Sequence, residues 1–83
     1  MKIPRDVSGL ELAQLLKKHG YRTTRQTGSH IRLTTRIKGI DHHITIPNHK
    51  PIKVGTLSDV LSDIAQYLKI DKDELLEGIF GKK

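Results

Sequence analysis

Alternating apolar and polar residues follow Gly28, and this pattern constrains the fold more than any other feature of the chain. Ile31 and Leu33 have one parity, and His30 and Arg32 have the other. Successive side chains of a β-strand point to opposite faces. We therefore expect Ile31 and Leu33 to face a core, while His30 and Arg32 share the solvent side. Gly28 is expected to form the turn before this strand, since glycine tolerates a positive φ.

The charge is unevenly distributed along the 83 residues, whose net charge is +6. Through Lys53 the chain holds 11 Lys/Arg and 3 Asp/Glu, whereas from Val54 onward it holds 4 and 6. A basic half favours a polyanionic partner such as a nucleic acid, although ordinary solvated charge is the simpler alternative. The chain has no cysteine, which excludes disulfides and thiolate metal ligands.

A chain of this length fits one domain with a modest core, so we expect a single domain over residues 1–83. The first residues, Met1 to Arg5, lack the long apolar run of a signal peptide. No stretch has the length and apolarity of a membrane span. The sequence therefore predicts a cytoplasmic protein with no membrane partner.

Three segments carry the apolar spacing and the terminal signals of helices. The expected helices are residues 9–19 between a Ser8 cap and Gly20, a helix from a Thr56 cap through Leu68, and a short helix from an Asp71 cap to Gly81, before a frayed Lys82 and Lys83. His19 would lie in the last turn of the first helix, where a positive charge favours the helix dipole.

Three short β-favouring segments lie between the first two helices: residues 21–26, 29–36 and 42–46. Pro47 ends the last one because proline has no N–H for the ladder. Short connections favour an antiparallel meander. The expected fold class is α+β, with a three-stranded antiparallel sheet and both main helices on one face. The open face would hold His30, Arg32, His43 and Thr45.

Several motifs in this order resemble the HicA toxins of bacterial and archaeal toxin–antitoxin pairs, from about Ser8 to Leu68. The motifs are Gly20-Tyr21, Arg25-Gln26-Thr27-Gly28-Ser29-His30, Ile44-Thr45-Ile46-Pro47-Asn48-His49 and Gly55-Thr56-Leu57. The resemblance implies a fold like the double-stranded-RNA-binding domain, mRNA cleavage, and inhibition by a HicB-type antitoxin. The histidine of the Gly-Ser-His triplet is the catalytic residue of that family, so His30 inherits this role. The segment from Asp71 to Phe80 extends past a minimal member.

The residues themselves are compatible with metal-independent RNA cleavage. In that reaction the 2′-hydroxyl attacks its own phosphate, helped by a base, an acid and nearby cations. Histidine suits the proton transfers because its ordinary pKa is about 6.5. We assign His30 as the general acid or base and Arg32 as the first cation beside the phosphate. The alternative for His30 is an ordinary surface or turn histidine.

The remaining candidates are side chains that surround His30 or contact the RNA backbone. Those expected at the RNA-binding surface are Gly28, Ser29, Arg25, Arg32, His49, Lys50 and Lys53. Other cations that could contact phosphates are Lys17, Lys18, Arg22, Arg36 and Lys38. Ser29 is expected to shape or cap the turn, and His42 to be a packed or edge histidine. His43 and His49 could act directly or could be ordinary exposed histidines.

No cofactor or metal ion is expected. Neighbouring His42 and His43 would point to opposite faces of a strand, and the chain has no H-E-x-x-H helix or carboxylate pair near its histidines. The leading hypothesis is an endoribonuclease toxin. A non-catalytic RNA-binding module of the same fold is the second hypothesis, and a protein-interaction module with a basic face is the third.

Overall fold

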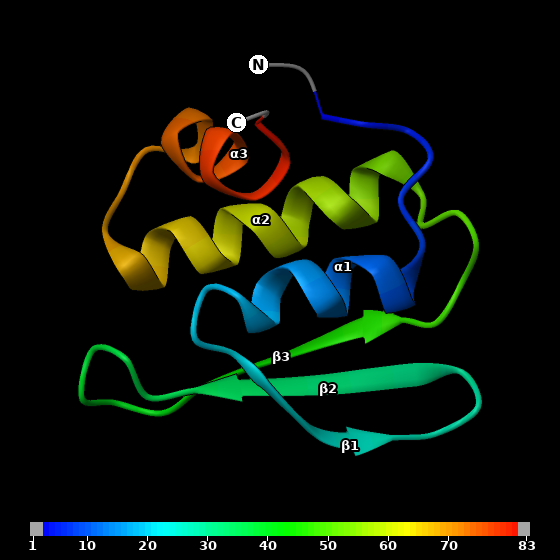
Figure 1. The fold of residues 1–83 in the computed structure, drawn as a ribbon, viewed down its shortest axis with the longest axis horizontal. Coiled ribbons are helices and arrows are strands. Elements are labelled where there is room, and N and C mark those ends of the chain that lie inside the picture. The colour runs from blue at the N-terminus through cyan, green and yellow to red at the C-terminus, as the bar shows by residue number, and fades with distance from the viewer. Residues whose placement is uncertain (1–2, 82–83) are drawn as a thin grey trace.

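A three-stranded antiparallel sheet carries the helices on one of its faces (Figure 1). The computed structural model describes residues 3–81, and the expected frayed end at Lys82 and Lys83 lies outside this range. The elements are α1 (Gly9–Lys17), β1 (Arg22–Gln26), β2 (His30–Thr35), β3 (His42–Pro47), α2 (Val54–Leu68) and α3 (Lys72–Phe80). This α+β arrangement is the one expected from the order of the sequence patterns.

The sheet has the order β1-β2-β3, and its pairing confirms the alternation seen in the sequence. Leu33 lies opposite Ile44, and both side chains are buried against the helices. One step along, Arg32 lies opposite Thr45, and both are exposed. Arg32, Thr45 and the other side chains of the same parity on β2 and β3 therefore point away from the helices, onto an uncovered face that we call the open face.

An irregularity in β1 changes which of its side chains reach the open face. Thr23 pairs with Leu33, but the next paired residue is Arg25, which lies opposite Arg32. Thr24 is the extra residue of a β-bulge at this point. Without the bulge, Arg22 and Arg25 would have opposite parity, and their side chains would point to opposite faces. The sequence pattern did not predict this bulge.

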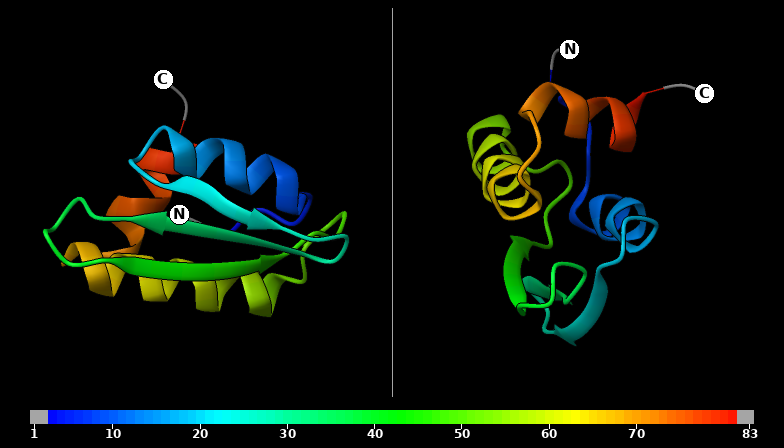
Figure 2. Two further views of the ribbon diagram at one scale, coloured as in Figure 1. Left: turned by 90° about the horizontal axis from the view of Figure 1, so that it is seen from below. Right: turned by 90° about the vertical axis from the view of Figure 1, so that its left-hand side faces the viewer.

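The helices form two further layers above the sheet (Figure 2). α1 and α2 lie beside each other on the sheet, and α3 covers them on the side away from it. The apolar stripes of the helices meet the inner face of the sheet, so the core lies between these layers. Its fully buried side chains include Leu12 and Leu16 of α1, Ile31, Leu33 and Ile46 of the sheet, and Leu57, Leu61 and Ile64 of α2.

The first helix begins as expected but ends earlier than expected. The Ser8 hydroxyl accepts a hydrogen bond from the Glu11 amide (3.0 Å), which caps the helix. The helix ends at Lys17, because the chain turns away through Gly20 with a φ of +98°. His19 therefore lies after the helix and not in its last turn. Its Nε2 is 3.1 Å from the carbonyl oxygen of Gly78, which ties the end of α1 to α3.

The second helix begins before the residue that was expected to cap it. Lys53 is the N-cap and Val54 the first helical residue, so the expectation of a Thr56 cap is wrong. The Leu57 amide donates to the Lys53 carbonyl (2.9 Å), and no side chain caps this end. A start without a side-chain cap gives no local sequence signal, so Thr56 was favoured instead. Asp71 is the N-cap of α3 as expected, although its carboxylate forms no capping hydrogen bond.

Candidate functional site

A tight turn at Thr27 to His30 delivers the candidate histidine to the start of β2. The Thr27 amide donates to the His30 carbonyl (2.9 Å), and the His30 amide donates to Thr27 Oγ1 (3.1 Å). The threonine side chain thus closes the expected turn, and Gly28 does not use the positive φ that glycine would have permitted. A methyl group added at Gly28 would meet no protein atom within 4 Å, so the turn is open to solvent there.

The imidazole of His30 is held through one nitrogen. Ser29 Oγ lies 3.1 Å from His30 Nδ1, so Ser29 contacts the ring of its neighbour instead of capping the turn. His30 is exposed, and its Nε2 has no hydrogen-bond partner within residues 3–81. One ring nitrogen is therefore oriented by the protein, and the other is available to a substrate.

The segment after β3 is tied to this turn and to α1. The Asn48 amide donates to the Ser29 carbonyl (2.9 Å), and Asn48 Nδ2 lies 3.4 Å from the Gly28 carbonyl oxygen. The Gly9 amide donates to the His49 carbonyl (2.9 Å). A Cβ at Gly9 would lie 2.3 Å from the Pro47 carbonyl oxygen, so only glycine permits this approach. These contacts fix the backbone of His49 near that of His30.

Two open pockets meet at His30 and Thr45. The first, which we call the histidine pocket, is lined by His30, Thr45, Pro47, His49, Lys53 and Thr56. The second, which we call the arginine pocket, is lined by Arg25, Thr27, His30, Arg32 and Thr45. His30 is therefore flanked by a second histidine and a lysine on one side and by two arginines on the other.

The structure brings most of the expected site residues together. Arg25, Arg32, His49 and Lys53 line one of the two pockets, and Gly28 and Ser29 belong to the turn that presents His30. Lys50 is exposed but lines neither pocket.

Five contributors to the site had no predicted role in it: Thr27, Thr45, Pro47, Asn48 and Thr56. Thr45 had the correct parity but no assigned role. Asn48 lies between Pro47 and His49 in one of the motifs that resemble the HicA toxins, so its position beside His49 was the available signal. Thr56 was interpreted only as a cap.

His42 belongs to a separate cluster on the helix side, which confirms the expectation of a packed histidine. Its ring stacks on Tyr67 with centroids 4.5 Å apart, and its Nε2 lies 3.2 Å from Asp63 Oδ1. Its Nδ1 lies 2.7 Å from the Tyr21 hydroxyl. Burial raises the pKa of Tyr21, and the nearby Tyr67 and Asp63 raise it further. The Asp63 carboxylate can only accept, so the tautomer with its hydrogen on Nε2 fits this contact and leaves Nδ1 to accept from the Tyr21 hydroxyl.

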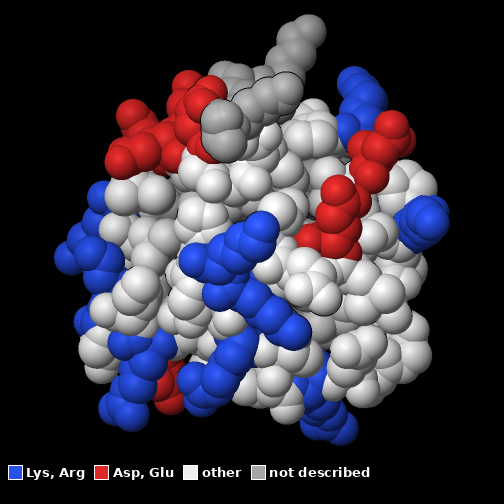
Figure 3. Space-filling view, in the orientation of Figure 1, with Lys and Arg blue, Asp and Glu red and all other residues white. Residues whose placement is uncertain are grey.

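Acidic and basic side chains lie on different parts of the surface, as the basic first half and the more acidic second half of the sequence indicate. In Figure 3, a group of acidic side chains lies beside α3, whereas basic side chains predominate over the half that contains the sheet. The first turn of α3 is acidic, with Asp73 and Glu74. No group of three or more His, Asp or Glu side chains in residues 3–81 is placed to hold a metal ion. The helices in this range include none that is long and apolar enough to cross a bilayer.

Comparison with known protein families identifies the chain. A family model described as the HicA toxin of bacterial toxin–antitoxin systems matches residues 9–66, well over half of the sequence. The chain belongs to the HicA toxin family. Comparisons with curated proteins and with solved structures gave no match. As a HicA family member, the protein has the role of a toxin, and an antitoxin is its class of partner.

The match covers all the residues that build the site. It begins at Gly9, which contacts His49, and extends beyond Thr56 into α2. It ends before α3, so the last helix lies outside the matched region, as the sequence resemblance also implied.

Proposed function

We propose that this HicA protein is an endoribonuclease that cleaves mRNA without a metal ion and uses His30 for proton transfer. The observation that carries the proposal is the placement of His30 between the two pockets, with Nδ1 bonded to Ser29 and Nε2 unbonded within the described chain. A pure binding surface needs cations but has no use for an oriented imidazole.

The proposed reaction uses the 2′-hydroxyl of the substrate as nucleophile. A base removes the hydroxyl proton, the oxygen attacks the adjacent phosphorus, and an acid protonates the leaving 5′-oxygen. The products are a 2′,3′-cyclic phosphate and a free 5′-hydroxyl. His30 Nε2 supplies one of these proton transfers. His49 lines the same pocket and is our candidate for the other.

Cations on both sides of His30 support the charge that develops on the phosphate. Arg32 lines the arginine pocket beside His30, and Lys53 lines the histidine pocket. Positive charges placed where negative charge develops stabilise the transition state. Arg25, Gly28 and Ser29 extend this surface, and the open side of Gly28 lets an RNA backbone approach the turn closely. Lys50 remains a candidate for a more peripheral phosphate contact.

The decisive experiment incubates purified wild-type and His30→Ala proteins with a long labelled RNA in EDTA. We expect cleavage by the wild type and a loss of about a hundred- to ten-thousandfold in the variant, the usual contribution of a positioned acid or base. RNA affinity should change little. The matched control is His19→Gln, because His19 contacts α3 and lines neither of the two pockets; it should cleave like the wild type.

The other outcomes select other functions. If the wild-type protein binds RNA but never cleaves it, the protein is a binding module of the same fold. If it neither cleaves RNA nor binds it better than an uncharged control protein does, its basic face serves a protein partner. Cleavage that persists in His30→Ala would move the catalytic assignment to His49.

The proposed partners are mRNA as substrate and a HicB-type antitoxin as inhibitor. The antitoxin would have to cover His30 to block access to its free nitrogen. The cations around the two pockets suit an acidic surface on that partner.

A further inference from the structure

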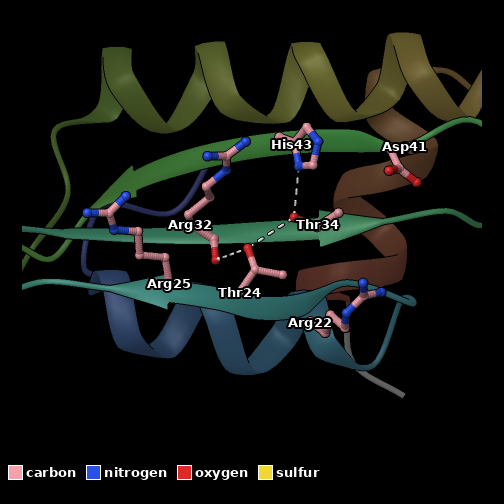
Figure 4. Close-up of a pocket in the computed structure, with 7 residues that line it drawn as sticks. All are labelled: Arg22, Thr24, Arg25, Arg32, Thr34, Asp41 and His43. Carbon is pink, nitrogen blue, oxygen red and sulfur yellow. Dashed lines mark hydrogen bonds between the residues drawn. The ribbon is translucent and has the colours of Figure 1, made fainter.

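A third pocket lies further along the open face, away from the proposed catalytic histidine (Figure 4). We call it the distal pocket; its lining includes Arg22, Arg25, Arg32, Thr34 and His43. It shares Arg25 and Arg32 with the arginine pocket, so the two hollows adjoin. The basic surface is thus continuous from Lys53 past His30 to Arg22.

The β-bulge at Thr24 builds this pocket. It allows both Arg22, opposite Thr34, and Arg25, opposite Arg32, to project from the open face. Figure 4 shows their side chains on the same side of the sheet. A regular strand would have turned one of them toward the helices.

The floor of the pocket is a fixed polar network across all three strands. Thr34 Oγ1 lies 3.1 Å from Thr24 Oγ1 and 2.9 Å from His43 Nδ1, as the dashed lines in Figure 4 indicate. The Thr34 side chain is buried beneath its neighbours, with only 4% of its surface exposed. These bonds hold the His43 ring by Nδ1 and leave its Nε2 without a partner in residues 3–81.

The cations of the pocket are free to bind an anion. Arg22, Arg25 and Arg32 form no ion pair with any carboxylate in the described part of the chain. The one acid in the lining, Asp41, pairs instead with Arg36 at 3.3 Å. Guanidinium groups that are not neutralised by protein carboxylates are suited to phosphate oxygens.

We propose that the distal pocket binds a backbone phosphate of the RNA a few nucleotides away from the scissile bond, so that the substrate strand runs along β2. This inference rests on the proposed ribonuclease function. From His30 to Thr34 the strand advances four residues, roughly 13 Å at about 3.3 Å per residue, a distance that an RNA strand covers in a few nucleotides. The site accordingly selects for a substrate longer than the reacting dinucleotide.

Binding in this pocket should depend on phosphates more than on bases. The chain has three aromatic residues, Tyr21, Tyr67 and Phe80, and all three pack on the helix side. The open face therefore offers no phenylalanine, tyrosine or tryptophan ring on which a base could stack, and recognition rests mainly on phosphates.

The test measures RNA binding in the His30→Ala protein, so that it does not depend on cleavage. The probes are a single-stranded oligonucleotide without self-complementarity and a dinucleoside monophosphate, which has only one phosphate. When both Arg22→Gln and His43→Gln are added to the His30→Ala protein, oligonucleotide binding should weaken about five- to tenfold. The slope of log affinity against log salt should shrink by about 0.7, the value for one lost phosphate contact on a single strand. Affinity for the dinucleoside monophosphate should not change.

Two controls make the result specific. Lys69→Gln removes an exposed cation at the end of α2, away from the open face, and should leave the oligonucleotide affinity and the salt slope unchanged. In the same His30→Ala protein, Arg22→Lys with His43 unchanged should bind the oligonucleotide almost as tightly as the parent does, since lysine still binds phosphate as a point charge. Circular dichroism and thermal unfolding confirm that each variant is folded.

Two outcomes would overturn the inference. If Arg22→Gln with His43→Gln binds like its parent while Arg32→Gln binds more weakly, the RNA leaves the sheet before the distal pocket. If Lys69→Gln weakens binding as much as the pocket variant does, the attraction is diffuse and no subsite exists. A failure of the proposed function would appear separately, as wild-type protein that does not cleave RNA.

Discussion

At the scale of single residues, the site depends on how the His30 ring is oriented. Ser29 Oγ lies 3.1 Å from Nδ1, and it is the ring's only hydrogen-bond partner among residues 3–81. If the serine hydroxyl donates, the ring hydrogen of neutral His30 is on Nε2; if it accepts, Nε2 is the free base. Ser29 therefore acts through His30 as a positioning residue.

Replacing Ser29 with alanine should lower kcat for RNA cleavage about fivefold, the equivalent of a hydrogen bond of about 1 kcal/mol. KM should stay the same, because the change affects the orientation of the ring and not the cations that bind RNA. The pH dependence of kcat should shift, which a purely structural role would not produce. Ser29→Thr keeps the hydroxyl and should retain most of the activity. An unchanged pH profile and kcat in Ser29→Ala would remove Ser29 from the mechanism.

Strand parity alone is enough to place several site residues on the correct face. Alternation along β2 and β3 puts His30, Arg32 and Thr45 on the side without helices, because period two follows directly from strand geometry. Asn48 was missed because its bonds to the turn join residues some twenty positions apart. Such contacts leave no periodic pattern in the sequence.

At the scale of elements, the order and type of the helices and strands followed from apolar spacing, terminal signals and β-favouring segments. Two features that the sequence did not predict have no local signal. α2 begins at Val54 without a side-chain cap, and the bulge at Thr24 has neither a glycine nor a turn residue to indicate it. The bulge matters most for function, because it decides that both Arg22 and Arg25 reach the open face.

The packing of α1 against the end of β3 gives a stability prediction with a matched control. Gly9→Ala should lower the free energy of unfolding by about 1–3 kcal/mol, because its Cβ would lie 2.3 Å from the Pro47 carbonyl oxygen. Gly55→Ala has no atom within 4 Å of its new methyl and should raise stability by up to about 1 kcal/mol through helix propensity. Urea denaturation of the three proteins measures both effects. Equal stability of Gly9→Ala and the wild type would show that the approach of α1 to β3 is looser than described.

At the scale of the whole molecule, the acidic and the basic surfaces lie on opposite sides of the fold. The helices occupy one side of the sheet, the acidic residues of α3 lie on the outermost layer, and the cationic pockets lie on the opposite, open face. The positive potential of the open face should therefore attract an anionic partner to that side of the molecule. The association rate of such a partner should depend on ionic strength.

A HicB-type antitoxin should accordingly bind the open face and cover His30. Hydrogen–deuterium exchange of the complex should show protection of residues 27–33 and little change in α3. The association rate should fall as salt is raised, since the attraction is electrostatic. Protection of α3 with residues 27–33 still exchanging freely would mean that the antitoxin inhibits without covering His30.

The hydrogen bonds that join Asn48 to Ser29 and Gly9 to His49 determine at which stage of its synthesis the chain can form the site. A nascent chain that has left the ribosome only through β2 already contains His30 but not the segment that completes its surroundings. The histidine pocket is assembled from the start of β2, from β3 and from the segment after β3, so it appears only after β3 and the residues up to Thr56 have emerged and folded back. For a toxin, this order separates the synthesis of the chain from the appearance of its site.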